Sequence, residues 1–272
     1  VANVSAAFNV EALSSVQVLG GVSLYNLILG IVIMILVALI TLGGLKRIAN
    51  VAEKIVPLMA IVYVLLGIIT IITHFQYIDD IFILIIKSAF NAKAALGGVV
   101  GITIMKTIRN GVGRGVFSNE AGLGTAPMAH ASTSEKDPVK QGLYGIFEIF
   151  MDTIVICTLT ACIVLCGYYA GIDITWGKAA GVELVTAGVG CALGMKWASL
   201  LLSTCVTLFA LTTILSWSLY GSRCCAFLLG EKSGKIYQAI FIFFIVVGGC
   251  MKLDIVWLIA ETFNGFMAIP NL

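Results

Sequence analysis

Long apolar stretches separated by short polar segments dominate the chain. A helix that crosses a membrane needs about 20 mostly apolar residues. The clearest stretches of this kind are Leu24–Gly44, Ile55–Thr73, Val139–Gly167, Trp197–Leu219 and Ile236–Met251. We therefore predict an all-α polytopic membrane protein. Pro57 falls in the first turn of its predicted helix, where proline is tolerated.

The remaining apolar segments are shorter or more polar. Ile81–Phe90 is too short to cross a bilayer, which predicts an interfacial or re-entrant segment. Gly171–Lys196 is rich in glycine, so we expect a loop with short helices there. Val1–Leu19 resembles the end of a helix and Ile255–Leu272 the start of one. Because the chain also begins without methionine, we interpret it as an internal fragment of a longer protein.

Ala94–Ala131 is long enough to span a membrane but is interrupted by glycines and charged residues. Each charge at mid-bilayer costs about 2.5–3.5 kcal/mol, so such groups usually face a cavity or one another. Irregular backbone at membrane depth is tolerated only against protein or a water-filled site. We expect a discontinuous helix whose unpaired amides and carbonyls bind a zwitterion or an alkali cation. The alternative is a cytoplasmic loop between two short helices.

Basic residues are concentrated in three short loops between the predicted spans. These residues are Lys46, Arg47, Lys54, Lys136, Lys140, Arg223, Lys232 and Lys235. The three loops fall on one side of the membrane if Ala94–Ala131 crosses it once. Since cytoplasmic loops carry an excess of lysine and arginine, we predict that this side is cytoplasmic.

Composition narrows the class of protein further. Of the 272 residues, 60% are hydrophobic and 11% are charged, whereas soluble domains carry roughly 25% charged residues. This excludes a soluble enzyme and a disordered protein, and the net charge of +2 gives no indication of a nucleic-acid partner. The eight cysteines lack metal-site spacing, and we interpret them as small hydrophobic residues. His74 and His130 are isolated, which is typical of histidines at helix ends.

Two carboxylates lie on one face of a predicted span. Glu148 and Asp152 are four residues apart, so they share a helix face. In apolar surroundings we expect them to pair with Arg109 or Arg114, to carry a proton or to bind a cation. A structural ion pair and a functional role are equally compatible with this pattern.

Hydroxyl and aromatic side chains cluster within two turns of Leu208–Gly221. Thr212 and Ser216 are four residues apart, and Thr213 and Trp217 form a neighbouring stripe. Hydroxyls in membrane helices often bond only the carbonyl four residues earlier. The clustering nevertheless favours the wall of a binding site.

Several segments resemble those of one transporter family in the same order. The most specific is RNGVGRGVFSNEAGLGTAPMAHAS, Arg109–Ser132, which resembles the signature of the alanine/glycine:cation symporters, also called sodium:alanine symporters. Further similar segments are LGGLKRIANVAEKIVPLMAIVYVLLG, QGLYGIFEIFMDTIVICTLTA, LFALTTILSWSLYG and NGFMAIPNL. The resemblance covers nearly the whole chain.

The resemblance implies a sodium-coupled symporter of alanine or glycine in the cell membrane, working by alternating access. Sodium would be the coupling ion, with no other cofactor and no enzymatic activity. It also implies the leucine-transporter-type fold, in which two inverted five-helix repeats have broken first and sixth helices. Residues 1–272 would form one incomplete transmembrane domain, from the end of helix three to the start of helix ten. Without broken helix one, such a fragment should not transport by itself.

The residue pattern and the resemblance together indicate candidate site residues. The candidate substrate ligands are Gly115, Phe117, Ser118, Asn119, Thr213 and Trp217, with an unwound Gly115–Asn119. The candidate sodium ligands are Thr212 and Ser216. The candidate structural or coupling charges are Arg114, Glu120 and Asp152, with Asp152 paired to an arginine of the broken helix.

Two positions depart from the family pattern, and two other functions remain as alternatives. Glu148 stands where an apolar or small residue is expected, and Ser216 where glycine is more usual, which would narrow the pocket. The first alternative is a membrane-embedded enzyme with Glu148 and Asp152 as an acid/base pair. The second is a non-transporting receptor or channel on the same fold.

Overall fold

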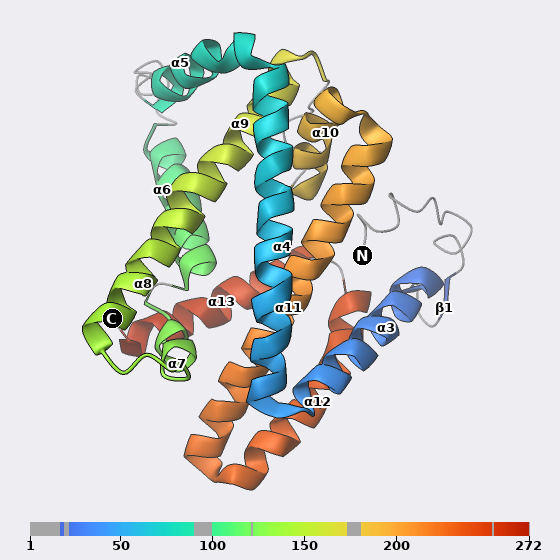
Figure 1. Cartoon of the computed structure of the whole chain (residues 1–272), viewed down its shortest axis with the longest axis vertical. Coiled ribbons are helices and arrows are strands. Elements are labelled where there is room, and N and C mark those ends of the chain that lie inside the picture. The colour runs from blue at the N-terminus through green and yellow to red at the C-terminus, as the bar shows by residue number, and fades with distance from the viewer. Residues whose placement is uncertain are drawn as a thin grey trace.

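The computed structural model describes residues 17–18, 22–89, 100–120, 122–172, 181–251 and 253–271. Apart from a small antiparallel hairpin of β1 (Gln17–Val18) and β2 (Val22–Ser23), the described elements are helices. The predicted helix end at Val1–Leu19 lies outside the described residues except for β1, which is extended. The all-α class of the prediction is otherwise confirmed (Figure 1).

The helices follow one another with short connections. In chain order they are α3 (Leu24–Thr41), α4 (Gly44–Thr73), η1 (Phe75–Tyr77), α5 (Ile78–Ala89), α6 (Val100–Asn119), α7 (Ala126–His130), α8 (Pro138–Phe150), η3 (Met151–Ile156), α9 (Cys157–Tyr169), α10 (Val182–Leu193), α11 (Met195–Leu229), α12 (Glu231–Cys250) and α13 (Leu253–Asn271). Most are α-helices, but η1 is a 3₁₀ turn and η3 is a π-helix.

Five described helical segments are long and apolar enough to cross a membrane. They are α3, α4, the continuous run Pro138–Tyr169, α11 and α12. Each corresponds to a predicted span, although α4 begins at Gly44 and α11 extends to Leu229. Pro57 therefore lies inside α4, so its placement in a first turn was wrong. Lysine and arginine are good helix formers, so these helices continue past the end of their apolar runs.

Six helices pack into what we call the scaffold: α3, α4, α9, α10, α11 and α12. The long helices α4 and α11 run through its centre, with α9 and α10 at one end and α3 and α12 at the other (Figure 1). One buried apolar cluster includes Leu66 of α4, Ile163 of α9, Val189 of α10 and Leu202 of α11. Apolar contacts between four helices thus fix their relative positions.

Glycine brings two scaffold helices into close contact. A Cβ added at Gly188 of α10 would overlap the carbonyl oxygen of Ile163 and lie 2.8 Å from its Cγ2 atom. A Cβ added at Gly167 of α9 would lie 2.9 Å from the Cα atom of Gly188. The backbones of α9 and α10 therefore meet where neither helix has a side chain.

Two shorter helices lie at the scaffold end away from the α3–α4 turn (Figure 1). The segment predicted as interfacial or re-entrant forms α5, whose Ile81 is fully buried against Cys162 and Cys166 of α9. Gly171–Lys196, predicted as a loop with short helices, contains α10. Its residues 173–180 lie outside the described residues.

The segments α6, α7, α8 and η3 lie beside the scaffold and are called the wall, although η3 continues directly into α9 (Figure 1). The prediction of a discontinuous helix in Ala94–Ala131 is confirmed, because α6 ends at Asn119 and α7 begins only at Ala126. Residues 94–99 and 121 of that prediction lie outside the described residues. The helix predicted at Val139–Gly167 runs through α8 and α9 but contains a π-helical segment, Met151–Ile156.

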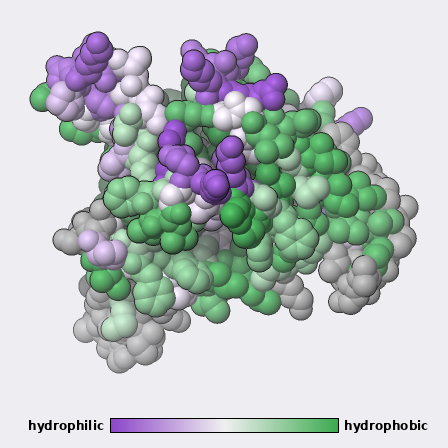
Figure 2. Space-filling model, turned by 90° about the horizontal axis from the view of Figure 1, so that it is seen from below, coloured by the Kyte–Doolittle hydropathy of each residue, from purple (hydrophilic) through white to green (hydrophobic). Residues whose placement is uncertain are grey.

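The three basic loops lie at one end of the molecule. The α3–α4, α7–α8 and α11–α12 connections all lie toward the lower end in Figure 1, as the charge pattern predicted. Seen from that end, hydrophilic side chains gather in patches on an otherwise largely hydrophobic surface (Figure 2). We call this the basic end.

Candidate functional site

A cavity of about 1020 Å³ lies between the wall and the scaffold. Its lining comes from the end of α6, from α7, the α7–α8 loop, α8 and η3, and from α4 and α11 on the scaffold side. Eight of the predicted site residues line it: Ser118, Asn119, Glu120, Asp152, Thr212, Thr213, Ser216 and Trp217. Loop residues such as Thr133 and Lys136 also line the cavity, which therefore reaches the basic end.

The break between α6 and α7 is built from residues in the left-handed region. Glu120 has a φ of 51°, and Gly122 and Gly124 each have a φ of 78°. Glycine adopts this region readily, whereas for glutamate it is uncommon and strained. The Thr125 hydroxyl, which is fully buried, donates a hydrogen bond of 2.6 Å to Oε2 of Glu120. A side-chain hydrogen bond thus holds the two ends of the break together.

The break lies beyond the segment predicted to be unwound. Gly115–Asn119 is part of the continuous helix α6, so the predicted unwinding there was wrong. A Cβ added at Gly115 would meet no described atom within 4 Å. The left-handed glycines Gly122 and Gly124 place the break five residues later, at Glu120–Thr125.

Two hydrogen bonds join the last turn of α6 to the π-helix η3. The Ser118 hydroxyl donates to Oδ2 of Asp152 at 2.7 Å. The neighbouring Thr153 hydroxyl donates to Oδ1 of Asn119 at 3.1 Å. A π-helical turn accommodates an extra residue and recurs at functional sites. Here it holds Asp152 and Thr153 beside successive residues of α6.

The predicted pairing of Asp152 with an arginine is wrong for Arg114. Nη2 of Arg114 lies 3.1 Å from Oε1 of Glu261 on α13, and its guanidinium lies 4.3 Å from the ring centroid of Trp257. An arginine that stacks on an aromatic ring while pairing with a carboxylate uses both features of its planar group. The Arg109 side chain lies outside the described side chains. Asp152 instead accepts the Ser118 hydroxyl.

Arg114 and Phe117 line a second, smaller cavity of about 350 Å³ between α6 and α13. The ring of Phe117 packs on Trp257 with a centroid distance of 5.1 Å. Phe117 is therefore directed toward α13 rather than into the larger cavity. Its predicted contact with substrate, like that of Gly115, has no support in this geometry.

The scaffold side of the cavity presents hydroxyl oxygens from α11. The Thr212 hydroxyl donates to the carbonyl of Phe209 at 3.0 Å, and the Ser216 hydroxyl donates to the carbonyl of Thr212 at 3.1 Å. Each hydroxyl has one hydrogen and two lone pairs, so a hydroxyl that donates to its own helix keeps acceptor capacity. These oxygens can therefore face a cation.

Trp217 bounds the same side of the cavity. Its indole packs edge-on against Tyr220 at a centroid distance of 6.0 Å, and both residues line the cavity. The neighbouring Thr213 hydroxyl donates to the carbonyl of Phe209 at 2.9 Å. A packed aromatic ring limits the size of any ligand held here.

Acidic residues outnumber basic ones in the cavity lining. The carboxylates of Glu120, Glu135, Glu148 and Asp152 line it, together with the single lysine Lys136 and with His130. Charges of one sign in a low-dielectric cleft raise the local concentration of the opposite ion. The cavity therefore favours cations.

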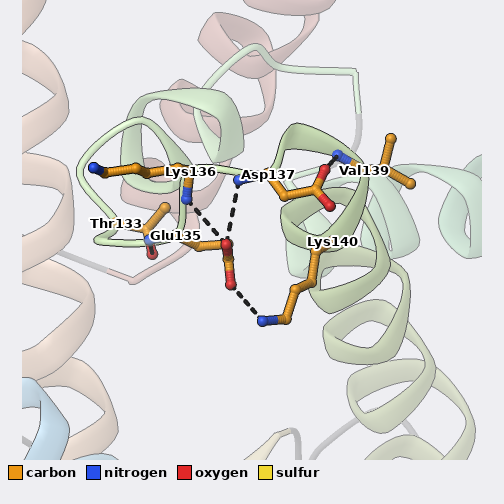
Figure 3. Close-up of polar contacts among 6 residues, drawn as sticks. All are labelled: Thr133, Glu135, Lys136, Asp137, Val139 and Lys140. Carbon is orange, nitrogen blue, oxygen red and sulfur yellow. Dashed lines mark hydrogen bonds and ion pairs between the residues drawn. The ribbon is translucent and has the colours of Figure 1, made fainter.

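An ordered loop leads from α7 to α8 at the basic end. Oε1 of Glu135 accepts the backbone N–H of Lys136 at 3.0 Å, and Oε2 lies 2.7 Å from Nζ of Lys140 (Figure 3). Asp137 accepts the Val139 N–H at 2.9 Å and thereby caps α8 (Figure 3). The Lys140 ion pair, followed by the Asp137 N–H, lowers the pKa of Glu135 below its ordinary value of 4.5.

Sequence reasoning missed the residues around His130. This histidine ends α7, as the sequence suggested, but it also lines the cavity and lies beside Gln141, Gly145 and Glu148 of α8. The spacing of these three α8 residues, which places them on one helix face, was the available signal. Their meeting with His130 depends on the α7–α8 turn, which no periodic pattern encodes.

The comparisons with known proteins agree on one family. The model of the sodium:alanine symporter family matches residues 1–272. An uncharacterized transporter of Haemophilus influenzae is 41% identical over 90% of this chain and 53% of its own length. The sodium/alanine symporter AgcS of Methanococcus maripaludis is 39% identical over 90% and 53%. The probable sodium/glutamine symporter GlnT of Bacillus subtilis is 36% identical over 91% and 50%. The chain thus spans about half the length of these relatives.

Proposed function

The chain belongs to the sodium:alanine symporter family, and we propose that the protein containing it couples the entry of alanine or glycine to sodium. It does so by alternating access in the cell membrane, with the basic end in the cytoplasm. The observation that carries the proposal is an acidic cavity beside a helix break, with hydroxyl oxygens on the opposite side. The names of relatives include both an alanine symporter and a glutamine symporter, so they do not decide the substrate. The proposed preference for small amino acids is based instead on the Trp217 ring that bounds the cavity.

The sodium ion binds against α11 in this proposal. Hard cations prefer oxygen ligands, and Thr212 and Ser216 present hydroxyls one helical turn apart in the cavity. Thr212 is almost fully buried, so a cation beside it is shielded from water. Asp152 across the cavity supplies negative charge from the wall. The ion thereby stabilises the approach of wall and scaffold.

The amino acid binds at the end of α6 and beside Trp217. The break leaves backbone amides and carbonyls without helical partners, and these groups suit the two charges of a zwitterion. Ser118 and Asn119 bring polar side chains to the same point, and Thr213 faces them from α11. The indole of Trp217 excludes long side chains.

The leucine-transporter-type fold is part of the proposal. A discontinuous helix between continuous ones, here α6 and α7 between α4 and α8, is typical of transporters built from inverted repeats. In that fold α3 is helix four, α4 is helix five, and α6 with α7 is helix six. The remaining helices follow as helix seven (α8, η3 and α9), helix eight (α11), helix nine (α12) and helix ten (α13).

The test is uptake by the full-length protein reconstituted in liposomes. Labelled alanine should accumulate with an inward sodium gradient and not with potassium in its place. Alanine binding without flux would favour a receptor, uncoupled flux a channel, and chemical conversion of alanine an enzyme. Any of these results would overturn the proposed symport.

A variant pair tests the sodium site. Thr212→Val keeps the side-chain shape and removes the oxygen, which costs roughly 1–3 kcal/mol, or about 5- to 150-fold in affinity. The sodium concentration for half-maximal uptake should rise accordingly. Thr204→Val is the matched control, because its hydroxyl bonds the Leu200 carbonyl of the same helix at an exposed position. Equal sodium dependence in both variants would show that the Thr212 hydroxyl does not bind the sodium ion.

A further inference from the structure

His130 lies in a contact that joins α7 to α8 on the cavity side. Its Nε2 atom lies 3.8 Å from Oε2 of Glu148, and its Nδ1 atom is hydrogen-bonded to the side-chain amide of Gln141. The ring passes over Gly145, where an added Cβ would lie 3.5 Å from Nε2. Gln141, Gly145 and Glu148 lie on one face of α8, so three positions of one helix surround the ring.

The geometry suits a histidine that gains a proton. At 3.8 Å the Glu148 carboxylate is within ion-pair distance but beyond ordinary hydrogen-bond length, so the neutral ring gains little from it. A protonated ring carries a charge and a donor on each nitrogen. Gln141 serves both states, because its amide presents either a donor or, turned over, an acceptor to Nδ1.

The other acidic groups that line the cavity have partners of their own among the described residues. Glu120 accepts the Thr125 hydroxyl, Asp152 accepts the Ser118 hydroxyl, and Glu135 pairs with Lys140. Lys136 and Tyr220 line the same cavity, and Cys224 of α11 contacts Met128 of α7. Glu148 is thus the acid placed to respond to the charge on His130.

The contact between His130 and α8 restrains the position of α7. The helix has only five residues, and it follows a break with left-handed residues at Glu120, Gly122 and Gly124. Such a break allows rotation of α7 unless side chains hold it in place. His130 ties the end of α7 to α8, beside a cavity that reaches the basic end.

We propose that His130, Gln141 and Glu148 form a proton-binding latch, which holds α7 against α8 when protons reach the cavity from the basic end. This proposal rests on the proposed transport function for its role, because release of the latch accompanies the return of the empty carrier. Histidine changes charge in the physiological pH range. Acid at the basic end therefore stabilises the present conformation and slows uptake.

The transport test changes pH on the basic-end side of liposomes that contain the full-length protein in one orientation. Lowering that pH from 7.8 to 6.0 should reduce sodium-driven alanine uptake about two- to fivefold, the range expected for one exposed ion pair. His130→Gln and Glu148→Gln should both lose this response. His74→Gln is the matched control, because His74 bonds Thr70 and Thr73 at the end of α4 and lies outside the cavity. Retention of the full response in His130→Gln would overturn the latch.

A second measurement does not depend on transport. Hydrogen exchange at the amides of Ala131, Ser132 and Thr133, corrected for intrinsic pH effects, should be slower at pH 6.0 than at pH 7.8 in the unmodified protein. His130→Gln and Glu148→Gln should abolish that difference. Absence of uptake with this protection intact would contradict the proposed function alone. If amide exchange at these three residues did not depend on pH in the unmodified protein, that result would contradict the latch alone.

Discussion

Glycine has opposite roles in the scaffold and in the wall. In the scaffold, Gly167 and Gly188 bring α9 and α10 together so closely that an added Cβ at either would collide with backbone. In the wall, a Cβ added at Gly111, Gly113 or Gly115 would meet no described atom within 4 Å. Glycine therefore enforces close packing between α9 and α10, whereas at these three positions of α6 it has no close neighbour among the described atoms.

The two regions also differ in what holds them together. The scaffold buries apolar clusters shared by several helices, in which Ile163, Val189 and Leu202 are fully buried. The wall is held by individual polar contacts, such as those of Ser118 with Asp152 and His130 with Glu148. Regions with few buried apolar contacts open at lower free-energy cost. Conformational change during transport should therefore be concentrated in the wall.

The largest expected effect comes from adding one methyl group to the scaffold. Gly188→Ala should separate α9 from α10, because the new Cβ would overlap the carbonyl oxygen of Ile163. Overpacking typically costs about 1–3 kcal/mol, so the Tm of the purified protein should fall by several degrees. Gly115→Ala is the matched variant and should raise stability, because alanine is favoured over glycine inside an exposed helix by about 1 kcal/mol. Equal changes in Tm would show that glycine does not have different roles in the scaffold and in the wall.

The next effect should come from the charge on the wall side of the cavity. Asp152→Asn should raise the half-saturating concentrations of sodium and alanine about 10- to 150-fold, since hydrogen bonds to charged groups contribute roughly 1.5–3 kcal/mol. The Tm should change little, because among the described side chains the partner of Asp152 is the Ser118 hydroxyl, which the amide oxygen of asparagine can still accept. Unchanged half-saturating concentrations would show that Asp152 has only a structural role.

A smaller effect on selectivity is expected from the scaffold side. Trp217→Ala should let longer amino acids compete with alanine, and the uptake ratio of glutamine to alanine should rise about tenfold. Trp197→Ala serves as the control, because Trp197 is exposed at the start of the same helix. An unchanged ratio would mean that Trp217 does not limit the substrate.

The smallest effect concerns the α7–α8 loop. Glu135 has a lowered pKa, so its ion pair with Lys140 stabilises the loop above its ordinary pKa of 4.5 and is lost as pH falls through the lowered value. Hydrogen exchange at the Lys136 and Asp137 amides, which Glu135 accepts, should therefore accelerate over that acidic range. Glu135→Gln should exchange faster at pH 7 and lose the acid-dependent step. Persistence of that step in the variant would assign it to another group.

The sequence was most informative where hydrophobic burial alone decides the structure. Apolar runs predicted the five spans, and the glycines and charges of Ala94–Ala131 predicted a broken helix. The helix limits were less accurate, because α4 and α11 extend beyond their apolar runs. Hydropathy reports where lipid can contact a helix, whereas the backbone continues wherever helical propensity allows.

The site could be predicted only in part. The grouping of Ser118, Asn119, Asp152, Thr212 and Trp217 in one cavity agrees with the candidates taken from the sequence. The partner of Arg114 could not be predicted, because Glu261 comes from α13, almost 150 residues later. The π-helix at Met151–Ile156 has no periodic signature either, and it determines how Asp152 faces α6.

Hydrogen exchange of the full-length protein, measured with and without sodium and alanine, is the most direct test of whether ligand binding changes the wall and leaves the scaffold unchanged. We expect the two ligands together to slow exchange in the break at Glu120–Thr125 and in α7, with little change in α9 and α10. Potassium in place of sodium should give no such protection. Protection confined to α9 and α10, or spread evenly over the chain, would contradict the account.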